Sequence, residues 1–258
     1  MAEARVNISV IVPTKNEEKN ITDCLSSVSW ADEVIVVDAR STDRTVEIAG
    51  RFTKNIFVRD WTGYAEVKQF ALQKATHDWV FWLDADERVT PALAEELIAI
   101  VQSPRSSYRA YEVARRAYFL GMWIRHSGWY PGYVIRLFQR RMATFTSASV
   151  HEKVIVQGPV GRLTSDLLHY TDDTIFHYLT KMNRYTSLAA EDSARGNRPF
   201  RLSALLVRPP YQFFRMYILR LGFLDGMHGL ILALLSAGHV FTKYAKLWDA
   251  ERIRGGVS

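Results

Sequence analysis

The stretch that decides the fold is residues 79–87, WVFWLDADE. Its first five residues are large and apolar, which is typical of a strand that is buried on both faces. Two carboxylates follow at once, Asp84 and Asp86, with a single alanine between them. In an open parallel sheet, ligands bind beyond the carboxyl ends of the strands. The stretch therefore predicts a central strand that delivers two carboxylates to a binding edge.

Three shorter apolar runs precede this strand, and helical segments separate all four. The runs are residues 8–12, 33–37 and 55–58, and the helical segments are residues 17–28, 42–52, 64–75 and 91–101. Alternating strands and helices predict a parallel sheet with helices on both faces. No G-x-G-x-x-G follows the first run and no G-x-x-x-x-G-K-S/T occurs in the chain, which disfavours dinucleotide-binding and P-loop enzymes.

The bulk composition is that of a folded, basic protein. The 258 residues are 48% hydrophobic and 23% charged, which excludes a disordered chain, and the formal net charge is +6. A basic surface suits an anionic partner, such as a phosphate-bearing substrate, an anionic lipid or a nucleic acid, or it serves solubility alone. The single cysteine, Cys24, permits no intrachain disulfide. No run of about 18 uncharged apolar residues occurs, so we expect no membrane-spanning helix.

Three of the predicted strands end in polar motifs. These are residues 13–17, PTKNE, residues 38–43, DARSTD, and residues 84–87, DADE. Because the carboxyl ends of parallel strands meet at one edge, we expect the motifs to converge on one crevice. Hard oxygen ligands such as Asp84 and Asp86 suit Mg²⁺ or Mn²⁺ shared with substrate phosphates. The alternative for an Asp-x-Asp pair is a solvated turn, which the position after an apolar strand disfavours.

These motifs resemble those of the family 2 inverting glycosyltransferases, which have the GT-A fold. The matching pieces are residues 12–17, VPTKNE, residues 36–38 and 41–43, VVD and STD, and residues 83–87, LDADE. Four further pieces resemble more narrowly the lipopolysaccharide core β-1,4-glucosyltransferases: residues 129–131, 136–138, 150–152 and 222–226. The chain departs from the family pattern Asp-Asp-Gly-Ser-Thr-Asp at Arg40, which replaces the glycine.

The resemblance implies a fold and a division of the chain. The fold would be α/β, with a GT-A mixed sheet, helices on both faces and amphipathic helices at the C-terminus. The catalytic domain would span residues 1–195, with a nucleotide-binding half at 1–103 and an acceptor half at 104–195. Residues 196–258 would form the amphipathic helical tail, in which Pro209 and Pro210 argue against a single unbroken helix.

The resemblance also assigns roles at the donor site. It implies that the nucleotide-sugar pocket is lined by Pro13, Thr14, Asn16 and Glu17. Asp38 would accept a hydrogen bond from the base. Lys68 would reach the diphosphate, or it is a surface lysine of an amphipathic helix. Apart from the resemblance, the guanidinium groups of Arg136, Arg140 and Arg141 are candidates for bidentate phosphate contacts, with at least one of the three expected to be a surface charge only.

A divalent metal, Mg²⁺ or Mn²⁺, is the cofactor that the resemblance implies. Asp86 would bind it directly, and Asp84 would face the ribose or the water shell of the metal. His169 ends a predicted strand and either supplies an imidazole to the metal, as in several families of this fold, or is structural. The metal would neutralise the charge that develops on the departing diphosphate.

Inverting transfer needs a base that deprotonates the acceptor hydroxyl. We expect Glu152, in the motif at residues 150–152, to be this base, because family members place a carboxylate after the variable acceptor loop. The alternative is a strand-end glutamate that faces water. His151 is a second candidate for the base, or it orients Glu152.

The resulting hypothesis is a metal-dependent inverting hexosyltransferase. It would move glucose from UDP-glucose to a hydroxyl of a lipid-linked saccharide such as the lipopolysaccharide inner core. The basic, aromatic tail would lie on an anionic membrane, so the protein would be cytoplasmic and peripheral on the inner membrane, unless the tail covers the catalytic domain or a subunit interface. Other hypotheses are transfer to polyprenyl phosphate or to a protein, and a catalytically silent protein that binds nucleotide-sugar or lipid. We expect no nucleic-acid partner, and a homo-oligomer stays open.

Overall fold

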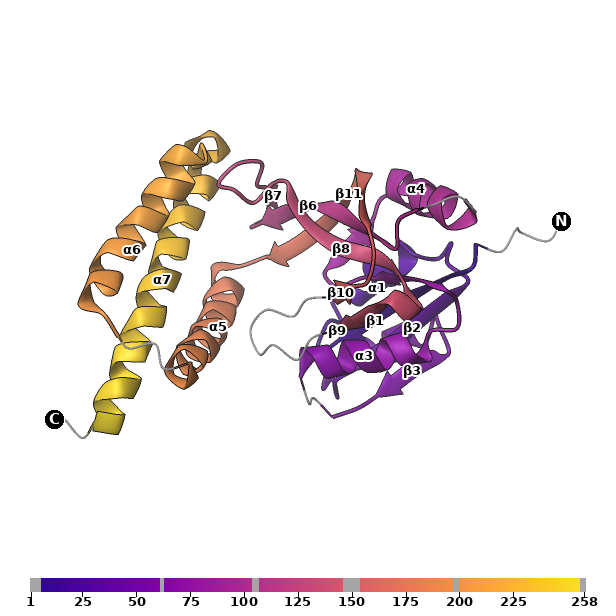
Figure 1. Cartoon of the computed structure of the whole chain (residues 1–258), viewed down its shortest axis with the longest axis horizontal. Helices are drawn as coiled ribbons and strands as arrows, with labels where there is room; N and C mark the ends of the chain where they lie inside the picture. Colours follow the sequence, from indigo (N-terminus) through magenta and orange to yellow (C-terminus); the bar gives the residue numbers. More distant parts are fainter. Residues whose placement is uncertain (1–5, 61–62, 104–106, 146–153, 197–199, 256–258) are drawn as a thin grey trace. The chain divides into compact units, whose positions relative to one another are not determined.

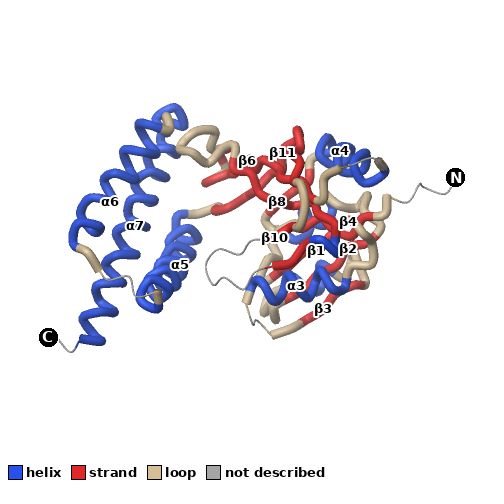
Figure 2. The backbone as a smooth tube through the Cα atoms, in the orientation of Figure 1, coloured by secondary structure: helices blue, strands red, loops and turns tan. Residues whose placement is uncertain are grey.

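The computed structural model describes residues 6–60, 63–103, 107–145, 154–196 and 200–255 (Figure 1 and Figure 2). Contacts divide the chain into two compact units. The first unit contains Met1–Arg116 and Gly132–His169, and the second contains Ala117–Pro131 and Tyr170–Ser258. The strand-end motifs all belong to the first unit, and the C-terminal helices belong to the second.

Four parallel strands form one half of the main sheet. They are β1 (Ile8–Thr14), β2 (Glu33–Asp38), β3 (Asn55–Val58) and β4 (Trp79–Trp82), in the spatial order β3-β2-β1-β4. The register pairs Thr14 with Asp38 and Ile11 with Trp82. The carboxyl ends of β1, β2 and β4 therefore lie at one edge of the sheet, which is where the sequence placed the polar motifs.

Helices cover both faces of these strands. One core joins β1 to α1 (Ile21–Ser26), α2 (Thr45–Ala49) and α4 (Pro91–Gln102), and a second core joins β1 to α3 (Tyr64–Lys74). Val10 and Val12 lie in the first core and Ile11 in the second, because successive side chains of a strand point to opposite faces. The predicted α/β sheet with helices on both faces is confirmed.

The start of α4 illustrates how the sequence sets these elements. Pro91 occupies the first turn, where its missing N–H is not needed. The hydroxyl of Thr90 accepts a hydrogen bond from the N–H of Leu93 at 3.2 Å and so caps the helix. Leu93 and Leu97 are buried, one turn apart. The helix thus begins and packs as its sequence predicts.

Antiparallel strands extend the main sheet and make it mixed. β8 (Gly132–Gln139) pairs with β4, β6 (Ala110–Phe119) pairs with β8 and with β7 (Met122–Trp123), and β11 (Val160–Asp172) pairs with β5 (Glu87–Val89). A separate two-stranded sheet consists of β9 (Ala143–Phe145) and β10 (Val154–Val156). The pairing of β11 with β5 brings His169 into register with Glu87, beside the Asp-x-Asp motif.

The C-terminal helices are α5 (Ile175–Arg195), α6 (Leu202–Phe214) and α7 (Gly226–Gly255), with short helical turns η2 (Arg215–Leu219) and η3 (Gly222–Asp225) between the last two. α7 packs along both α5 and α6 (Figure 1). By contacts, α5 groups with α6 and α7 in the second unit. The division of the chain into a catalytic domain at residues 1–195 and a tail at residues 196–258 stays a prediction.

The expected helix break at Pro209 and Pro210 is wrong, because both prolines lie inside α6. Each proline removes one backbone hydrogen bond from the helix, and α6 continues through both and packs along α7. The chain changes direction later, after Leu219, where Leu221 adopts a left-handed conformation with a φ of 54°.

One segment of the described chain, Gly222–Ile253, is long and apolar enough to cross a membrane, judged by length and composition alone. The requirement for a run without charges was therefore too strict, since Asp225 and His228 do not prevent the segment from meeting the length and hydropathy criteria. Core helices of soluble proteins meet the same criteria, so the finding by itself does not place the helix in a bilayer.

Candidate active site

The ends of β1 and β2 are tied together through Asp38. This carboxylate is buried and accepts hydrogen bonds from the hydroxyl of Thr14 at 3.0 Å and from the backbone N–H of Ser41 at 2.8 Å. The hydroxyl of Ser41 donates to the same carboxylate. Asp38 therefore lies at the predicted edge, and most of its hydrogen-bonding capacity is used by its own loops.

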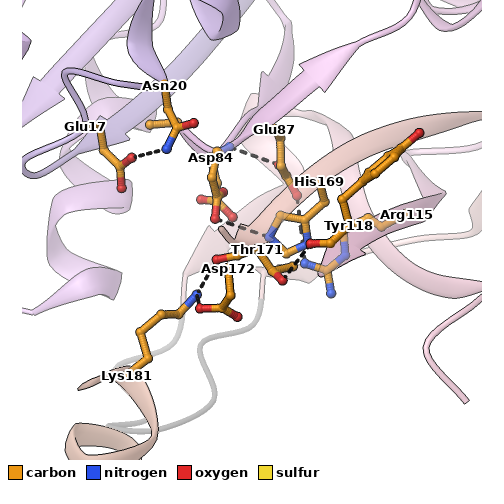
Figure 3. A network of polar contacts seen from close by, with 12 residues as sticks. Glu17, Asn20, Asp84, Glu87, Arg115, Tyr118, His169, Thr171, Asp172 and Lys181 are labelled. Carbon is orange, nitrogen blue, oxygen red and sulfur yellow. Dashed lines mark hydrogen bonds and ion pairs between the residues drawn. The ribbon is translucent and has the colours of Figure 1, made fainter. Parts of the chain in front are cut away.

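The loops that follow β1 and β2 are also joined directly. The N–H of Asn16 donates to the hydroxyl of Ser41 at 2.8 Å, and the amide oxygen of Asn16 accepts from the N–H of Thr42 at 2.8 Å. The N–H of Glu17 donates to the hydroxyl of Thr45 at 2.7 Å, and the carboxylate of Glu17 accepts from the side chain of Asn20 at 2.9 Å (Figure 3). The predicted pocket residues Asn16 and Glu17 thus belong to one hydrogen-bonded pair of loops. The first of these loops continues from the end of β1, where Pro13 is half-buried.

Arg40 occupies the glycine position of the family pattern in the conformation that favours glycine. Its φ is +53°, in the left-handed region. Its guanidinium forms an exposed ion pair with Asp60, with Nε and Oδ1 2.6 Å apart. Arg40 therefore adopts the backbone conformation that glycine would adopt in this turn, and this conformation is strained for a residue with a side chain.

Asp84, the first carboxylate of the Asp-x-Asp motif, is surrounded by positive charge. Its Oδ2 lies 2.6 Å from Nη2 of Arg136, its Oδ1 accepts a hydrogen bond from the indole N–H of Trp82 at 2.8 Å, and Nζ of Lys68 lies 3.9 Å away. Burial acts to raise the pKa of Asp84, but the charges of Arg136 and Lys68 outweigh it and hold the pKa well below its ordinary value. The carboxylate is therefore ionised and locked in place.

Arg136 is the centre of this arrangement and is itself buried. Its Nη2 contacts Asp84 and Glu87, each at 2.6 Å, and its guanidinium lies 4.0 Å from the centroid of the Trp82 ring. Lys68 lies 3.9 Å from the same ring. Burial acts to lower the pKa of Arg136, but the two carboxylates raise it above its ordinary value. We predicted phosphate contacts for Arg136 and Lys68, and the structure places both against Asp84.

Glu87 is the fully buried carboxylate of this cluster, whereas Asp84 is half-buried. It accepts a hydrogen bond from the N–H of Asp84 at 3.0 Å, and Nη1 of Arg115 lies 3.8 Å from its Oε1 (Figure 3). Burial raises the pKa of Glu87 above its ordinary value. Sequence reasoning quoted Glu87 in the motif but gave it no role, and it treated Trp82 as a strand residue only. The signal was available, because Glu87 directly follows the Asp-x-Asp pair and Trp82 precedes it by two residues.

Asp86, the second carboxylate of the motif, lies beside His169. Nε2 of the histidine is 3.4 Å from Oδ2 of Asp86, and both side chains are partly exposed. β5 and β11 produce this contact, since their register places His169 next to the residue that follows Asp86. The predicted metal ligands, which are far apart in sequence, are thus brought together.

A carboxylate oxygen and an imidazole nitrogen are a donor set that fits Mn²⁺ or Mg²⁺, provided that phosphate and water oxygens complete the coordination. Within the described ranges, no group of three or more His, Cys, Asp or Glu side chains forms a complete protein cage for a metal. Asp86 and His169 supply two donor atoms, so a metal at this position would need further ligands from water or phosphate. The predicted base Glu152 and its neighbour His151 lie outside the described residues.

A mixed α/β sheet with an Asp-x-Asp pair at its strand ends defines a glycosyltransferase of the GT-A type. The chain belongs to glycosyl transferase family 2, whose domain matches residues 9–160. The family and the fold that the sequence predicted are both confirmed.

The similarity to relatives extends beyond this domain. The chain is 29% identical over 260 residues to the lipopolysaccharide core biosynthesis glycosyltransferase LpsC of Rhizobium meliloti (strain 1021), covering 93% of this chain and 94% of the relative. It is 30% identical over 251 residues to an uncharacterized glycosyltransferase of Rickettsia typhi (strain ATCC VR-144 / Wilmington), covering 93% and 86%. Among solved structures, the mannosyltransferase PcManGT from Pyrobaculum calidifontis, in complex with GDP-Man and Mn²⁺, matches with a TM-score of 0.54 at 16% identity, covering 95% of this chain and 88% of that chain.

Proposed function

We propose that this glycosyltransferase moves a hexose, glucose from UDP-glucose, to a hydroxyl of a lipid-linked saccharide such as the lipopolysaccharide inner core, with inversion at the anomeric carbon. The observation that carries the proposal is the pairing of Asp86 with His169 beside the locked carboxylate of Asp84. The similarity to LpsC along the whole chain supports a saccharide of the lipopolysaccharide core as the acceptor.

Asp86 and His169 would hold Mg²⁺ or Mn²⁺ on the sugar-nucleotide side of the cluster. When bound, the metal supplies Lewis-acid stabilisation of the departing diphosphate. Asp84 would not bind the metal directly, because its two oxygens are engaged by Arg136 and Trp82. We propose instead that Asp84 fixes the backbone between β4 and β5, so that Asp86 points toward the donor.

Arg136 and Lys68 would act as buried counter-ions to Asp84, a role that replaces our expectation of direct diphosphate contacts. Both side chains lie almost entirely inside the protein. Removing them would leave Asp84 and Glu87 as like charges in close contact, and an uncompensated buried charge is strongly destabilising. Arg136 and Lys68 would thus contribute to catalysis by holding the Asp-x-Asp motif in position.

The loops after β1 and β2 would form the donor pocket, with Pro13, Thr14, Asn16 and Glu17 at its wall. A carboxylate can accept about four hydrogen bonds, and Asp38 receives three from Thr14 and Ser41. We propose that the remaining acceptor position of Asp38 receives the N–H of the base. Glu152 would take the proton of the acceptor hydroxyl, and His151 would orient it.

Donor turnover tests the proposal directly. Purified protein with Mg²⁺ or Mn²⁺ is supplied with UDP-glucose, GDP-mannose or ADP-glucose, and nucleotide diphosphate release is measured with and without EDTA. We expect release from UDP-glucose that EDTA suppresses, and loss of that release in Asp86→Asn and His169→Gln. Glu95→Gln, at an exposed position of α4, is the matched control and should keep full activity. Release that resists EDTA would contradict the metal proposal.

Acceptor trials separate the remaining alternatives. Delipidated core oligosaccharide, polyprenyl phosphate and a protein acceptor are compared, and NMR of the product gives the anomeric configuration. A β-linked product from an α-linked donor supports inversion. Binding of UDP without turnover on any acceptor would identify a silent binding protein. We further propose that the enzyme acts at the cytoplasmic face of the inner membrane, where a lipid-linked acceptor is found.

A further inference from the structure

An apolar surface of the second unit has no covering element among the described residues. α6 exposes Leu202, Leu206, Val207, Tyr211 and Phe214. The turn from η2 to the start of α7 continues this exposure with Ile218, Leu219, Leu221, Phe223, Leu224 and Met227. We call these residues together the docking face. Large apolar side chains that are exposed along a helix and along the turn that follows it are typical of an interaction surface, so a partner is expected.

The ionic side chains carried by α6 and by the turn that follows it are basic, apart from the buried Asp225, and the carboxylate of Glu251 in α7 accepts the N–H of Phe200 at 2.7 Å just before α6. Between Asp192 and Asp249 the sequence contains a single acidic residue, Asp225. Asp225 is buried, where it accepts hydrogen bonds from the N–H of His126 at 3.0 Å and from the imidazole of His126 at 2.9 Å. The exposed ionic groups of α6 and the turn are arginines, namely Arg201, Arg208, Arg215 and Arg220. Apolar side chains flanked by arginines, without exposed carboxylates, are complementary to an anionic lipid surface.

α7 is hydrogen-bonded to α5, a polar helix that is unsuited to the interior of a bilayer. Nζ of Lys246 donates to the backbone oxygen of Asn183 at 2.7 Å, to the hydroxyl of Thr186 at 2.9 Å and to that of Ser187 at 2.8 Å, all in α5. α5 is polar and carries Arg184, Glu191 and Asp192 among its charged residues. Charged side chains in the hydrocarbon core are costly. The packing therefore favours a helix pair that lies on a membrane over a helix that spans one.

We propose that the docking face binds one leaflet of an anionic membrane, with the apolar side chains of α6 and of the η2–η3 turn in the outer hydrocarbon and the arginines on lipid phosphates, and that no helix crosses the bilayer. The proposal rests on the proposed function, in which the acceptor is lipid-linked, and it identifies the surface that delivers the enzyme to that acceptor.

Vesicle sedimentation tests the surface without any need for turnover. The full chain is mixed with vesicles of phosphatidylcholine alone or with added phosphatidylglycerol. We expect binding to the anionic vesicles that falls with added salt, and a loss of more than about tenfold in the double variant Leu206→Ser/Phe214→Ser, since several buried methylene groups are removed. Val58→Ser removes an equally exposed apolar side chain from β3 and should leave binding unchanged. Equal loss in both variants would overturn the proposal.

A fluorescent label reports insertion of the turn. Cys24 is buried, and burial raises the pKa of its thiol, so a cysteine introduced as Leu224→Cys reacts selectively. We expect quenching of a label at this position by lipids brominated on the acyl chain, and none for a label at Val58→Cys. Release of the wild-type chain by alkaline carbonate supports one-leaflet docking, whereas retention until detergent is added would show a spanning helix and overturn it.

Two further results are distinguishable. Failure to bind vesicles, together with a concentration-dependent dimer that Leu206→Ser/Phe214→Ser dissociates, would identify a second copy as the partner of the docking face and overturn the proposal. If UDP release is absent while vesicle binding and label quenching behave as expected, the proposed function fails and the docking surface stands. UDP release in solution should be unchanged in the double variant, because these side chains lie outside the site in the first unit.

Discussion

Nη2 of Arg136 lies 2.6 Å from a carboxylate oxygen of Asp84 and 2.6 Å from one of Glu87, so a single buried guanidinium group contacts the carboxylates at both ends of the DADE motif. The arginine comes from β8, in the half of the chain that follows the motif. The stability of the motif therefore depends on a distant strand.

Arg136→Met tests this dependence. The variant removes the cation that contacts both Asp84 and the buried Glu87, and the other cations that pair with them lie 3.8 and 3.9 Å away. We expect the free energy of unfolding to fall by about 3 to 5 kcal/mol. Urea denaturation monitored by circular dichroism gives the value. Arg141→Met, at an exposed position after the same strand, should change it by less than about 0.5 kcal/mol. Similar stabilities for the two variants would contradict the assignment.

The pH dependence of stability follows from the lowered pKa of Asp84. A carboxyl group whose pKa is lower in the folded than in the unfolded state binds fewer protons when folded, so it stabilises the fold above its unfolded pKa of about 3.9 and loses this contribution as the pH falls further. We expect stability to decline with acid below about pH 4. The decline should be shallower in Asp84→Asn, and denaturation series at several pH values measure it. An unchanged slope in this variant would show that other groups cause the decline.

Arg40→Gly tests the strain in the β2 loop. Relief of the left-handed conformation of a non-glycine residue is worth about 1 kcal/mol, and the exposed ion pair with Asp60 contributes less than about 1 kcal/mol. We expect the glycine variant to exceed the stability of Arg40→Ala, which loses the same ion pair but keeps the strain. The comparison is made by thermal unfolding, and equal melting temperatures would argue against strain at this position.

Gly229 and Gly238 form a matched pair within α7. A Cβ atom at Gly229 would lie 1.9 Å from the backbone oxygen of Gly222, while a Cβ at Gly238 would meet no atom within 4 Å. We expect Gly229→Ala to destabilise the second unit by about 1 to 3 kcal/mol, because the backbone must move. Gly238→Ala should stabilise it by up to about 1 kcal/mol through helix propensity. Thermal unfolding of the two variants measures this difference. An unchanged melting temperature in Gly229→Ala would contradict the close contact between residues 229 and 222.

The parallel half of the fold was predictable because it depends on local patterns. Continuous apolar runs such as residues 79–83 indicated buried strands, and strand polarity then placed Thr14, Asp38 and Asp84 at one edge. The pairing of Asp86 with His169 was anticipated from the resemblance and not from spacing, since it depends on the antiparallel register of β5 and β11. Long-range register has no local signature in one sequence.

The counter-ion role of Arg136 was missed for a related reason. An arginine in an apolar strand is compatible with a phosphate contact and equally with an internal ion pair. The geometry shows that its guanidinium group forms hydrogen bonds with the carboxylates of Asp84 and Glu87. The prolines of α6 misled in the opposite direction. Taken locally, the two prolines predict the end of a helix. Both nevertheless lie inside α6, which packs along α7.

The separation of Arg136 from Asp84 by 52 residues also bears on biosynthesis. During translation the motif leaves the ribosome long before its buried cation exists, so an incomplete chain carries mutually repelling carboxylates at the end of β4. A chain that ends before Arg136 would therefore lack the cation that holds this loop in its folded arrangement.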